Sequence, residues 1–375
     1  MSGFSNAVSS RMLSSGWLLA WRERLLANER FQRWAASFPL TRPVARRHAQ
    51  RAFDLCAGFV YSQVLAATLR AGILEALAKS AKSEASLVAL TGLPPERLVL
   101  LLTAAESLEL IERRSKQHWG LGPVGAALSA NAGALAMVRH HALFYADLAD
   151  PLALLRGDNP ETHLTGYWSY ARNGACVDVQ GYSELMARSQ PMVAREILQA
   201  WDFRRHSVVL DVGGGEGAFL TQVAAAAPAV ALRLFDLPEV ITRASNVLQA
   251  AGLGSRVSLH GGSFLKDELP RGADLITLVR VAHDHDDDAV MHLFKRIRVA
   301  LPAEGRLLLA EPMSGAEGAG RMADAYLAFY LLAMGQGRPR TAARLCEMLR
   351  EAGFRAAREI STRMPMLTSI VVADA

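Results

Sequence analysis

Cysteine is scarce in this chain. Among its 375 residues there are three cysteines, Cys56, Cys176 and Cys346, and they lie far apart. An odd, widely spaced set of this kind excludes a disulfide framework and a cysteine-based metal cage. We expect each thiol to be buried as a small apolar group in a reduced compartment.

Long apolar runs are missing as well. No stretch approaches the roughly 20 uninterrupted apolar residues of a bilayer-spanning helix, and residues 1–6 lack the charged and apolar regions of a signal peptide. We therefore expect a cytoplasmic protein. Because 51% of the chain is hydrophobic, its length allows a sizeable core and about two or three domains.

Residues 1–51 hold much of the positive charge, with nine arginines against two glutamates. Large apolar side chains, among them Trp17, Trp21 and Trp34, are interleaved at helical spacing. An amphipathic helix with tryptophan on one side and arginine on the other can lie in a membrane interface. A helix that covers the core or exchanges with a second subunit explains the pattern equally well. Nucleic acid is disfavoured, because lysine is scarce here and no aromatic platform follows. We treat residues 1–50 as a basic amphipathic leader.

Residues 51–165 have the pattern of a mostly helical domain. Residues 87–98 predict a helix, a turn and a second helix, and residues 110–121 predict a two-stranded wing. A winged-helix pattern in isolation would favour DNA binding. The corresponding recognition helix, residues 95–110, is rich in leucine and has Arg97 as its one basic residue. Such a face is suited to packing against protein.

The most informative stretch begins at residue 208. Residues 208–212 predict a short buried strand, and residues 213–217, four of which are glycine, predict a tight turn into a helix. Glycine permits the turn and lets a ligand approach the backbone without a Cβ in the way. Residues 232–236 predict a second strand that ends in Asp236. A carboxylate at that position can accept hydrogen bonds from both hydroxyls of a ribose.

The glycine turn lacks the third glycine of a dinucleotide-binding motif, because Phe219 and Leu220 follow instead. A smaller nucleoside such as S-adenosylmethionine therefore fits better. Residues 273–282 predict another buried strand, and a polar cluster at residues 283–288 follows at once. Ligands of open α/β sheets lie beyond the carboxyl ends of the strands, where this cluster would fall.

Several segments together resemble the S-adenosylmethionine-dependent O-methyltransferases of the plant caffeate and acetylserotonin type. They are residues 210–217, 235–238, 280–284, 309–312, 340–341 and 352–354. The resemblance implies an α/β fold with a Rossmann-like class I methyltransferase domain, a doubly wound sheet, at residues 166–375. A mostly helical winged-helix dimerisation domain at residues 51–165 would precede it. A homodimer and no role for nucleic acid are implied as well.

The same resemblance implies the roles of individual residues. His283 would be the general base, oriented by Glu311 or Asp284. The cofactor would be S-adenosyl-L-methionine, and the residues implied to bind it are Asp211, Gly213, Gly215, Asp236, Leu237, Ser263, Phe264 and Arg280. The hydrophobic acceptor would contact Met186, Tyr326, Tyr330 and Met334.

No metal is expected. The polar cluster at residues 283–288 could hold a divalent cation, as in the small catechol methyltransferases. Residues 286–288 also make an ordinary solvated helix start, with carboxylates near the positive end of the helix dipole, and we prefer that interpretation.

Two positions depart from the family's pattern. Gly262 stands where the family usually has an acid that contacts the adenine amine. Pro339 stands where the family commonly has a glutamate that helps to position the histidine. The sequence leaves open what replaces these two acids.

Residues 53–63, residues 334–341 and the leader resemble the bacterial carotenoid branch of the family. That branch implies methyl transfer to the tertiary 1-hydroxyl of an acyclic carotenoid such as hydroxyneurosporene or demethylspheroidene. A membrane-dissolved acceptor would give the leader a purpose as a peripheral contact on the inner photosynthetic membrane. Two alternatives share the architecture: a C-methyltransferase acting on a bacteriochlorophyll-type ring, and an O-methyltransferase of phenols. A winged-helix regulator would need a basic recognition helix.

Overall fold

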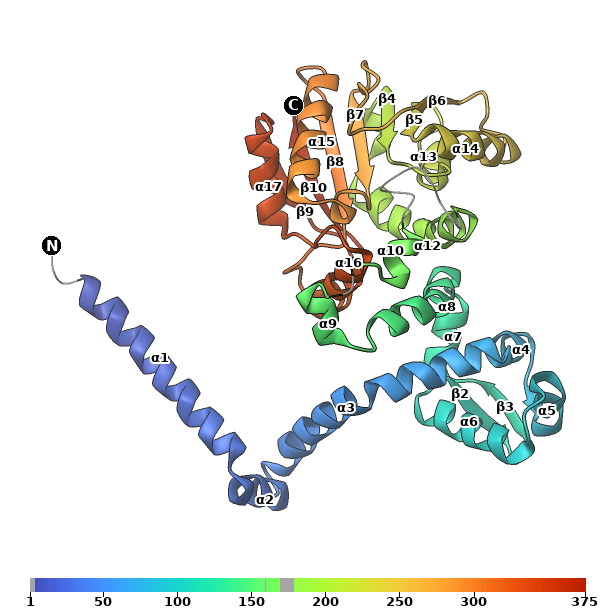
Figure 1. Ribbon diagram of the computed structural model, residues 1–375, viewed down its shortest axis with the longest axis vertical. Helices are drawn as coiled ribbons and strands as arrows, with labels where there is room; N and C mark the ends of the chain where they lie inside the picture. The colour runs from blue at the N-terminus through green and yellow to red at the C-terminus, as the bar shows by residue number, and fades with distance from the viewer. Residues whose placement is uncertain (1–3, 159, 169–178) are drawn as a thin grey trace. The chain divides into compact units, whose positions relative to one another are not determined.

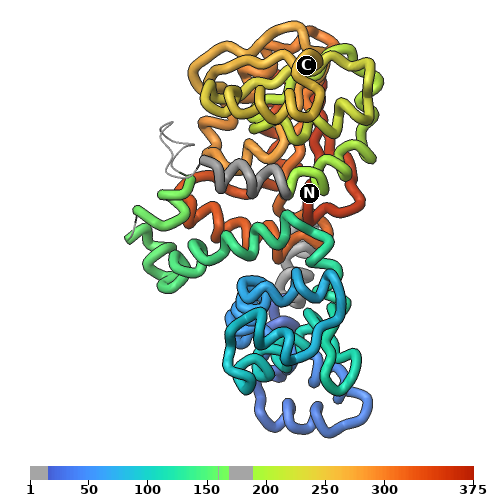
Figure 2. Tube along the Cα trace, turned by 90° about the vertical axis from the view of Figure 1, so that its right-hand side faces the viewer, coloured from blue at the N-terminus to red at the C-terminus, as the bar shows by residue number. Residues whose placement is uncertain are grey.

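The computed structural model describes residues 4–158, 160–168 and 179–375, with the side chains of all of these except residues 4–15 and 179–188. The chain divides into two compact units, Met1–Ala126 and Ala127–Ala375 (Figures 1 and 2). Residues 127–165 fall in the second unit, whereas the sequence pattern grouped them with the first. The functional boundaries at residues 50 and 165 stay predictions.

The first unit begins with three helices, α1 (Phe4–Ala27), α2 (Glu29–Ser37) and α3 (Arg42–Arg70). Asn28 caps α2, because its side-chain oxygen accepts hydrogen bonds from the amides of Arg30 and Phe31 at 2.9 and 3.1 Å. The leader is therefore helical, and the predicted boundary at residue 50 lies inside α3, which continues across it.

These helices leave large apolar side chains in solvent. Trp17 is 68% exposed, Leu55 86% and Phe59 69%. Within the described ranges, α3 is long and apolar enough to cross a membrane by length and composition, with 11% of its most apolar window buried. Asp54 and Gln63 interrupt its apolar residues, so a search for uninterrupted runs misses it. Core helices of soluble proteins pass the same test, so length and composition alone do not make α3 a span.

The expectation of three buried cysteines is wrong for one of them. Cys56 is exposed on α3, whereas Cys346 is buried. Cys176 lies outside the described residues. The exposure of Cys56 has the same cause as that of Leu55 and Phe59, since this part of α3 has little of its own unit packed against it.

The rest of the first unit is a small helical body with a three-stranded sheet. Its elements are α4 (Ile73–Lys79), β1 (Lys82–Ser83), α5 (Glu84–Thr91), α6 (Pro95–Ser107), β2 (Ile111–Ser115) and β3 (His118–Leu121). The predicted helix pair and hairpin are confirmed, and the two-residue strand β1 adds to the edge of β3. Leu98 and Leu102 of α6 are buried, as is Trp119 of β3. These two leucines of α6 therefore lie in the core of the unit, whereas Leu100 is 65% exposed. That this helix face packs against another protein chain stays a prediction.

A seven-stranded sheet organises the second unit. The strands are β4 (Val208–Val212), β5 (Ala231–Asp236), β6 (Val257–Gly261), β7 (Leu275–Val279), β8 (Arg306–Glu311), β9 (Ala356–Ile360) and β10 (Ser369–Asp374), in the order β6-β5-β4-β7-β8-β10-β9. The strands from β6 to β8 are parallel, and β10 is antiparallel to both its neighbours. This is the predicted doubly wound α/β sheet, whose order reverses at β4.

Helices cover both faces of this sheet (Figure 1). α15 (Asp287–Ala300) and α17 (Ala342–Glu351) pack on the face that includes Leu210 and Ile276. The opposite face, which includes Val209, is covered by α12 (Val179–Ala200), α13 (Ala218–Ala226) and α14 (Pro238–Ala250). Alternate residues of β4 thus enter different cores, which explains why the strands read as continuous apolar runs.

Helices α7 (Pro123–Ser129), α8 (Ala132–Asp147), α9 (Pro151–Arg156) and α10 (His163–Tyr167) join the small unit to α12. α8 and α10 share an apolar cluster with α16 (Ala328–Met334) and with the π-helical turn η3 (Arg321–Leu327) before it. The apolar segment at residues 321–334 therefore begins as a π-helix and continues as an α-helix. Residues 156–180, rich in glycine, asparagine and aromatic residues, have the sequence pattern of an exposed connection, yet Leu164 and Trp168 are buried in this cluster.

Candidate active site

The glycine turn lies at the carboxyl end of β4, where the sheet order reverses. Gly213 and Gly215 have φ of 70° and 60°, in the left-handed region that favours glycine. A Cβ on Gly213 would come within 2.8 Å of Val281, whereas one on Gly215 would meet no atom within 4 Å. The space beside Gly215 is therefore open for a ligand.

Asp236 closes β5 directly opposite this turn. One carboxylate oxygen accepts the amide of Gly215 at 2.8 Å, and the other accepts the amide of Leu237 at 2.7 Å. Each oxygen keeps a lone pair for a further donor. Burial raises the pKa of Asp236 to about 6, although the two backbone hydrogen bonds oppose the rise. The arrangement suits a pair of ribose hydroxyls.

Asp211 lies beneath the turn. It is 1% exposed, and its Oδ1 accepts the hydroxyl of Thr277 at 2.6 Å. Its Oδ2 has no hydrogen-bond partner among the described residues. Burial raises the pKa of Asp211 to about 7, opposed by the Thr277 hydrogen bond and assisted by the charge of Asp236. A cationic group near the turn would compensate this buried acid.

A cavity of about 110 Å³ connects these residues with the polar cluster after β7. It is lined by Trp168, Gly213, Asp236, Leu237, Gly262, Ser263, Phe264, Leu265, Arg280, Val281, Asp284, His285 and Met334. Most of the predicted cofactor residues thus surround one space. Leu265 and Val281, which also line this space, were not predicted as site residues. Trp168 carried a signal, because it stands in an aromatic-rich segment before α12.

Arg280 connects the cavity to α12. Its φ of 57° is strained for a residue with a side chain. Its amide donates to the carbonyl of Ala310 at 2.9 Å, and its guanidinium donates to the hydroxyl of Ser189 at 2.7 Å. The strained bend turns the chain out of the sheet, so that the residues after it reach the cavity.

His283 follows in the short 3₁₀ turn η2 (Ala282–Asp284) and is 8% exposed. Its Nδ1 is hydrogen bonded to Oε2 of Glu311, the last residue of β8. Its Nε2 lies 3.1 Å from Oδ1 of Asp284. Because β7 and β8 are parallel neighbours, their carboxyl ends bring histidine and glutamate together. Both acids that the sequence offered as orienting groups therefore contact the ring.

The charge state of His283 follows from its two neighbours. Burial opposes the charged ring, but the carboxylates of Asp284 and Glu311 outweigh it and raise the pKa of His283. Burial also raises the pKa of Asp284. The nearby His285 lies edge-on to Phe264 with ring centroids 5.3 Å apart, and burial lowers its pKa. With Nδ1–H held by Glu311, Nε2 is the nitrogen that can accept a proton from an acceptor.

Not all of the residues predicted to contact the acceptor line the cavity. Met334 lines the cavity, whereas Tyr326 and Tyr330 are not among its lining residues and belong to the apolar cluster shared by α8, α10 and α16. His141 and His140 of α8 are hydrogen bonded to the hydroxyls of Tyr326 and Tyr330 at 2.8 and 2.6 Å. The hydroxyls of both tyrosines are therefore engaged within the protein. Met186 lies outside the residues whose side chains are described.

The two departures from the family's pattern have structural accounts. A Cβ on Gly262 would come within 2.9 Å of the ring of Phe235, so an acid there would need that ring to move. Around Pro339, the amide of Arg338 donates to the carbonyl of His283 at 2.9 Å. Backbone contacts thus reach the histidine turn at the place where the family commonly has an acid.

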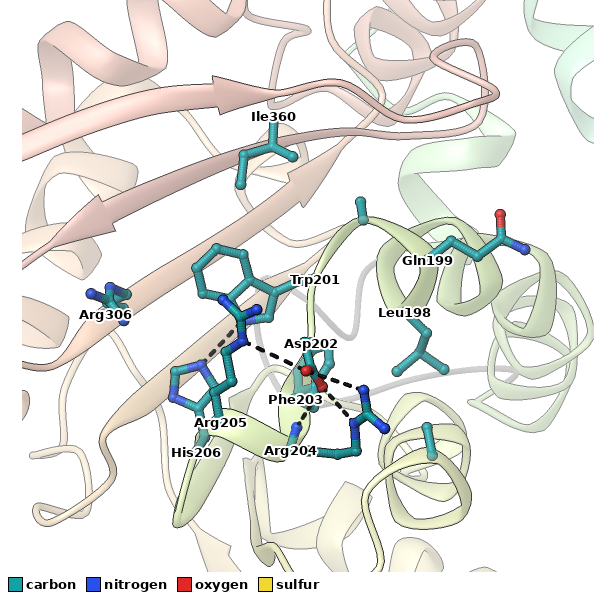
Figure 3. Close-up of a pocket in the computed structure, with 12 residues that line it drawn as sticks. Leu198, Gln199, Trp201, Asp202, Phe203, Arg204, Arg205, His206, Arg306 and Ile360 are labelled. Carbon is teal, nitrogen blue, oxygen red and sulfur yellow. Dashed lines mark hydrogen bonds and ion pairs between the residues drawn. The ribbon is translucent and has the colours of Figure 1, made fainter.

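A larger cavity, about 580 Å³, lies away from these residues. Figure 3 shows Trp201, Asp202 and His206 within it, and none of the predicted site residues lines it. Arg204 and Arg205 both form ion pairs with Asp202 there. Its cations are balanced by protein acids, and it is not part of the site.

No group of three or more histidine, cysteine or acidic side chains is placed to hold a metal ion within the described part of the chain. His283, Asp284 and His285 lie close together, but two of them are engaged with one another and with Glu311.

The sheet order, the glycine turn at its reversal and the acid that ends β5 define a class I methyltransferase fold. Residues 145–355 match the model of the O-methyltransferase domain. The chain is 44% identical over 354 residues to the demethylspheroidene O-methyltransferase of Cereibacter sphaeroides, covering 93% of both chains. It is 40% identical over 355 residues to the enzyme of the same name in Rhodobacter capsulatus, covering 94% of this chain and 88% of that one.

Human N-acetylserotonin methyltransferase in complex with SAM is 22% identical and has a TM-score of 0.73, over 87% of this chain and 97% of that one, which supports the fold. The chain belongs to the O-methyltransferase family, and its cofactor is S-adenosylmethionine. The open space at Gly215 and the free lone pairs of Asp236 fit that cofactor.

Proposed function

We propose that this protein transfers a methyl group to the tertiary 1-hydroxyl of an acyclic carotenoid, of the hydroxyneurosporene or demethylspheroidene kind. The observation that carries the proposal is the 44% identity to a demethylspheroidene O-methyltransferase along 93% of both chains. Similarity of this extent reaches beyond the second unit into the first, and is not confined to the cofactor site. The apolar and aromatic side chains of Trp168 and Met334, which line the cavity, are suited to a hydrophobic acceptor.

Bound S-adenosylmethionine would supply a methyl carbon already activated by its sulfonium. Asp236 would hold the ribose, Gly213 and Gly215 would admit the methionine part, and Phe264 would lie against the adenine. The protein's main task is then to align the acceptor oxygen with the methyl and the sulfur. Alignment of this kind can lower a barrier by about 7–11 kcal/mol.

His283 would accept the proton of the acceptor hydroxyl at Nε2 as the oxygen bonds to the methyl carbon and the carbon–sulfur bond breaks. Glu311 would keep Nδ1 protonated and stabilise the imidazolium that forms. General base catalysis contributes about 10²–10⁴-fold. Because a tertiary alcohol is far less acidic than a phenol, its proton should leave late, and alignment should contribute more than deprotonation.

The test is the pigment composition of a strain from which the gene has been deleted. The strain should accumulate carotenoids with a free tertiary hydroxyl, and purified protein with S-adenosylmethionine should convert them to the methyl ether. Normal carotenoids with an altered bacteriochlorophyll would instead support C-methylation of a ring. Turnover of simple phenols but not of carotenoid alcohols would support the phenolic alternative.

We further propose a homodimer built by the winged-helix body of the first unit, and a peripheral contact of the leader with the inner photosynthetic membrane. The leader's exposed Trp17, Trp21 and Trp34 and its many arginines support the membrane contact. Interfacial binding grows with buried apolar area and with attraction to anionic lipid. A membrane-dissolved acceptor would then be reached by a cytoplasmic enzyme.

A further inference from the structure

Arg340 is buried against the turn that carries His283. The residue is 6% exposed, and all three guanidinium nitrogens are hydrogen bonded. Nη1 donates to the carbonyl of Ala282 at 2.9 Å, and Nη2 donates to the carbonyl of His285 at 2.7 Å. Nε donates to the carboxylate of Asp287, at the start of α15, at 2.8 Å. The two carbonyls stand on either side of His283 in the chain.

The turn has little internal support. Within it, the amide of Asp284 donates to the carbonyl of Val281 at 3.2 Å, and the amide of His285 donates to the carbonyl of Ala282 at 3.3 Å. Short 3₁₀ turns have poor hydrogen-bond geometry and depend on their surroundings. On one side Glu311 holds the amides of Val281 and Ala282 at 3.0 and 2.8 Å. On the other side the carbonyls are held by Arg340.

The segment around Arg340 is itself anchored. The carbonyl of Arg340 accepts the amide of Ser314, in the chain that follows β8, at 3.0 Å. The amide of Gly337 donates to the carboxylate of Asp286 at 3.2 Å. The guanidinium therefore presents its donors from a fixed backbone, and its planar fork is matched to acceptors in three directions.

We propose that Arg340 is a positioning residue for methyl transfer: it sets the orientation of His283 by holding the carbonyls of Ala282 and His285. The inference rests on the proposed role of His283 as the general base. It also assigns a function to the segment in which Pro339 replaces the family's acid. A buried cation beside that position holds the turn through its backbone.

The test is a double-mutant cycle between Arg340→Lys and His283→Ala. Lysine keeps the charge but cannot reach three acceptors, so the ring should move. A misplacement of about 1 Å can cost about 10²-fold in rate, and we expect a loss of that size in kcat. Affinity for S-adenosylhomocysteine, measured by calorimetry, should be unchanged. In the His283→Ala background, Arg340→Lys should cause no further loss, because residues that act as a unit are not additive.

Two further variants separate positioning from stability. Arg344→Ala is the matched control, because the Arg344 side chain is 42% exposed on α17 and pairs with Glu347 and Glu351. It should leave kcat unchanged. Asp287→Asn weakens the anchor of the guanidinium without removing it, and should give a smaller loss than Arg340→Lys. If Arg340→Ala also folds, millimolar guanidinium should restore part of its turnover.

The outcomes also separate this inference from the proposed base. Equal losses from Arg340→Lys in the normal and His283→Ala backgrounds would overturn the positioning role alone. A parallel fall in kcat and in S-adenosylhomocysteine affinity would overturn it too, because the effect would then be general. If His283→Ala had normal turnover with the carotenoid alcohol, the proposed base itself would be wrong.

Discussion

Glu311 and His283 face each other across the ends of two neighbouring parallel strands. One oxygen of the Glu311 carboxylate is bonded to Nδ1 of His283, and the other accepts the amides of Val281 and Ala282. A single buried acid thus orients both the ring and the turn that carries it. The relationship requires a carboxylate, since both oxygens act as acceptors.

Glu311→Gln should therefore reduce turnover. The amide nitrogen of glutamine would donate to Nδ1, and the proton of the neutral ring would move to Nε2, where the acceptor's proton has to go. We expect kcat to fall by about 10²–10⁴-fold, with little change in affinity for S-adenosylhomocysteine. Steady-state kinetics and calorimetry measure the two quantities. An unchanged kcat would show that the ring needs no carboxylate.

Asp236→Ala should weaken cofactor binding strongly while the fold stays intact, because both ribose acceptors are lost. Gly215→Val should abolish binding, since the side chain would fill the open space beside the turn and adopt a left-handed φ of 60°. Gly252→Val is the matched control, with φ of 72° and no atom within 4 Å of the added Cβ. It should unfold more easily but bind normally. Unchanged calorimetric affinity in Asp236→Ala would contradict the ribose assignment.

The pH dependence of kcat should rise with pH through a midpoint above the ordinary histidine value. The carboxylates of Asp284 and Glu311 outweigh the opposing effect of burial and raise the pKa of His283, so that the neutral base forms only at higher pH. Asp284→Asn removes one of these charges and should lower the pKa of His283, which moves the acidic limb to lower pH. Carotenoid turnover measured across the pH range gives the acidic limb of the unchanged protein and that of Asp284→Asn. A midpoint that stays fixed in Asp284→Asn would assign the limb to another group.

Gly337→Ala should damage the site beyond its effect on the backbone. Gly337 has φ of 81°, and an added Cβ would come 2.2 Å from the carbonyl oxygen of His283. Gly318→Ala is the control, with φ of 72° and no atom within 4 Å. The control should lose about 1–2 kcal/mol of unfolding free energy from backbone strain and keep its kcat. Gly337→Ala should lose more stability and also turnover, measured by denaturant unfolding and kinetics.

Deleting residues 1–40 should leave cofactor binding unchanged but reduce both liposome association and activity on membrane-embedded acceptor. The apolar side chains and arginines that would contact anionic lipid are lost with the segment. Flotation with anionic liposomes measures the association. Trp17→Ser with Trp21→Ser should act in the same direction, whereas Leu152→Ser, exposed in the second unit, should not.

The deletion of residues 1–40 also distinguishes a membrane contact of the leader from a role in a subunit interface. If the truncated protein floats as well as the full chain, the membrane contact is wrong. If it turns monomeric while the full chain is dimeric, the exposed apolar side chains of the leader belong to a subunit interface.

The local pattern of the sequence was sufficient for the sheet and the cofactor end of the site. Short apolar runs, the glycine turn after β4 and the acid at the end of β5 are encoded within a few residues each, and the structure has them where they were expected. In a parallel sheet the ligand side follows from strand direction alone. The resemblance then supplied roles for His283 and Glu311, which no local pattern contains.

Other features depended on contacts between distant segments. Arg340 contacts the turn of His283 although the two are far apart in the sequence: Arg340 and Ala282 are separated by 58 positions. Nothing in the residues next to Arg340 predicts that contact. Trp168 reads as part of an exposed loop, but its indole nitrogen donates to Tyr330 in a buried cluster. Cys56 reads as a core residue because its helix is apolar, and it is exposed because this part of the helix lacks a packed neighbour.

By itself, the sequence determined the fold class, the family and the cofactor, because strand periodicity, glycine conformation and a terminal acid act over short distances along the chain. The tertiary structure alone decided that the guanidinium of Arg340 meets the turn of His283 and which apolar side chains stay in solvent. Hydrogen bonds from a guanidinium to backbone carbonyls can be made by any arginine that reaches them, and burial depends on what the rest of the fold places nearby. Both are properties of proximity in space, which residue type and spacing do not encode.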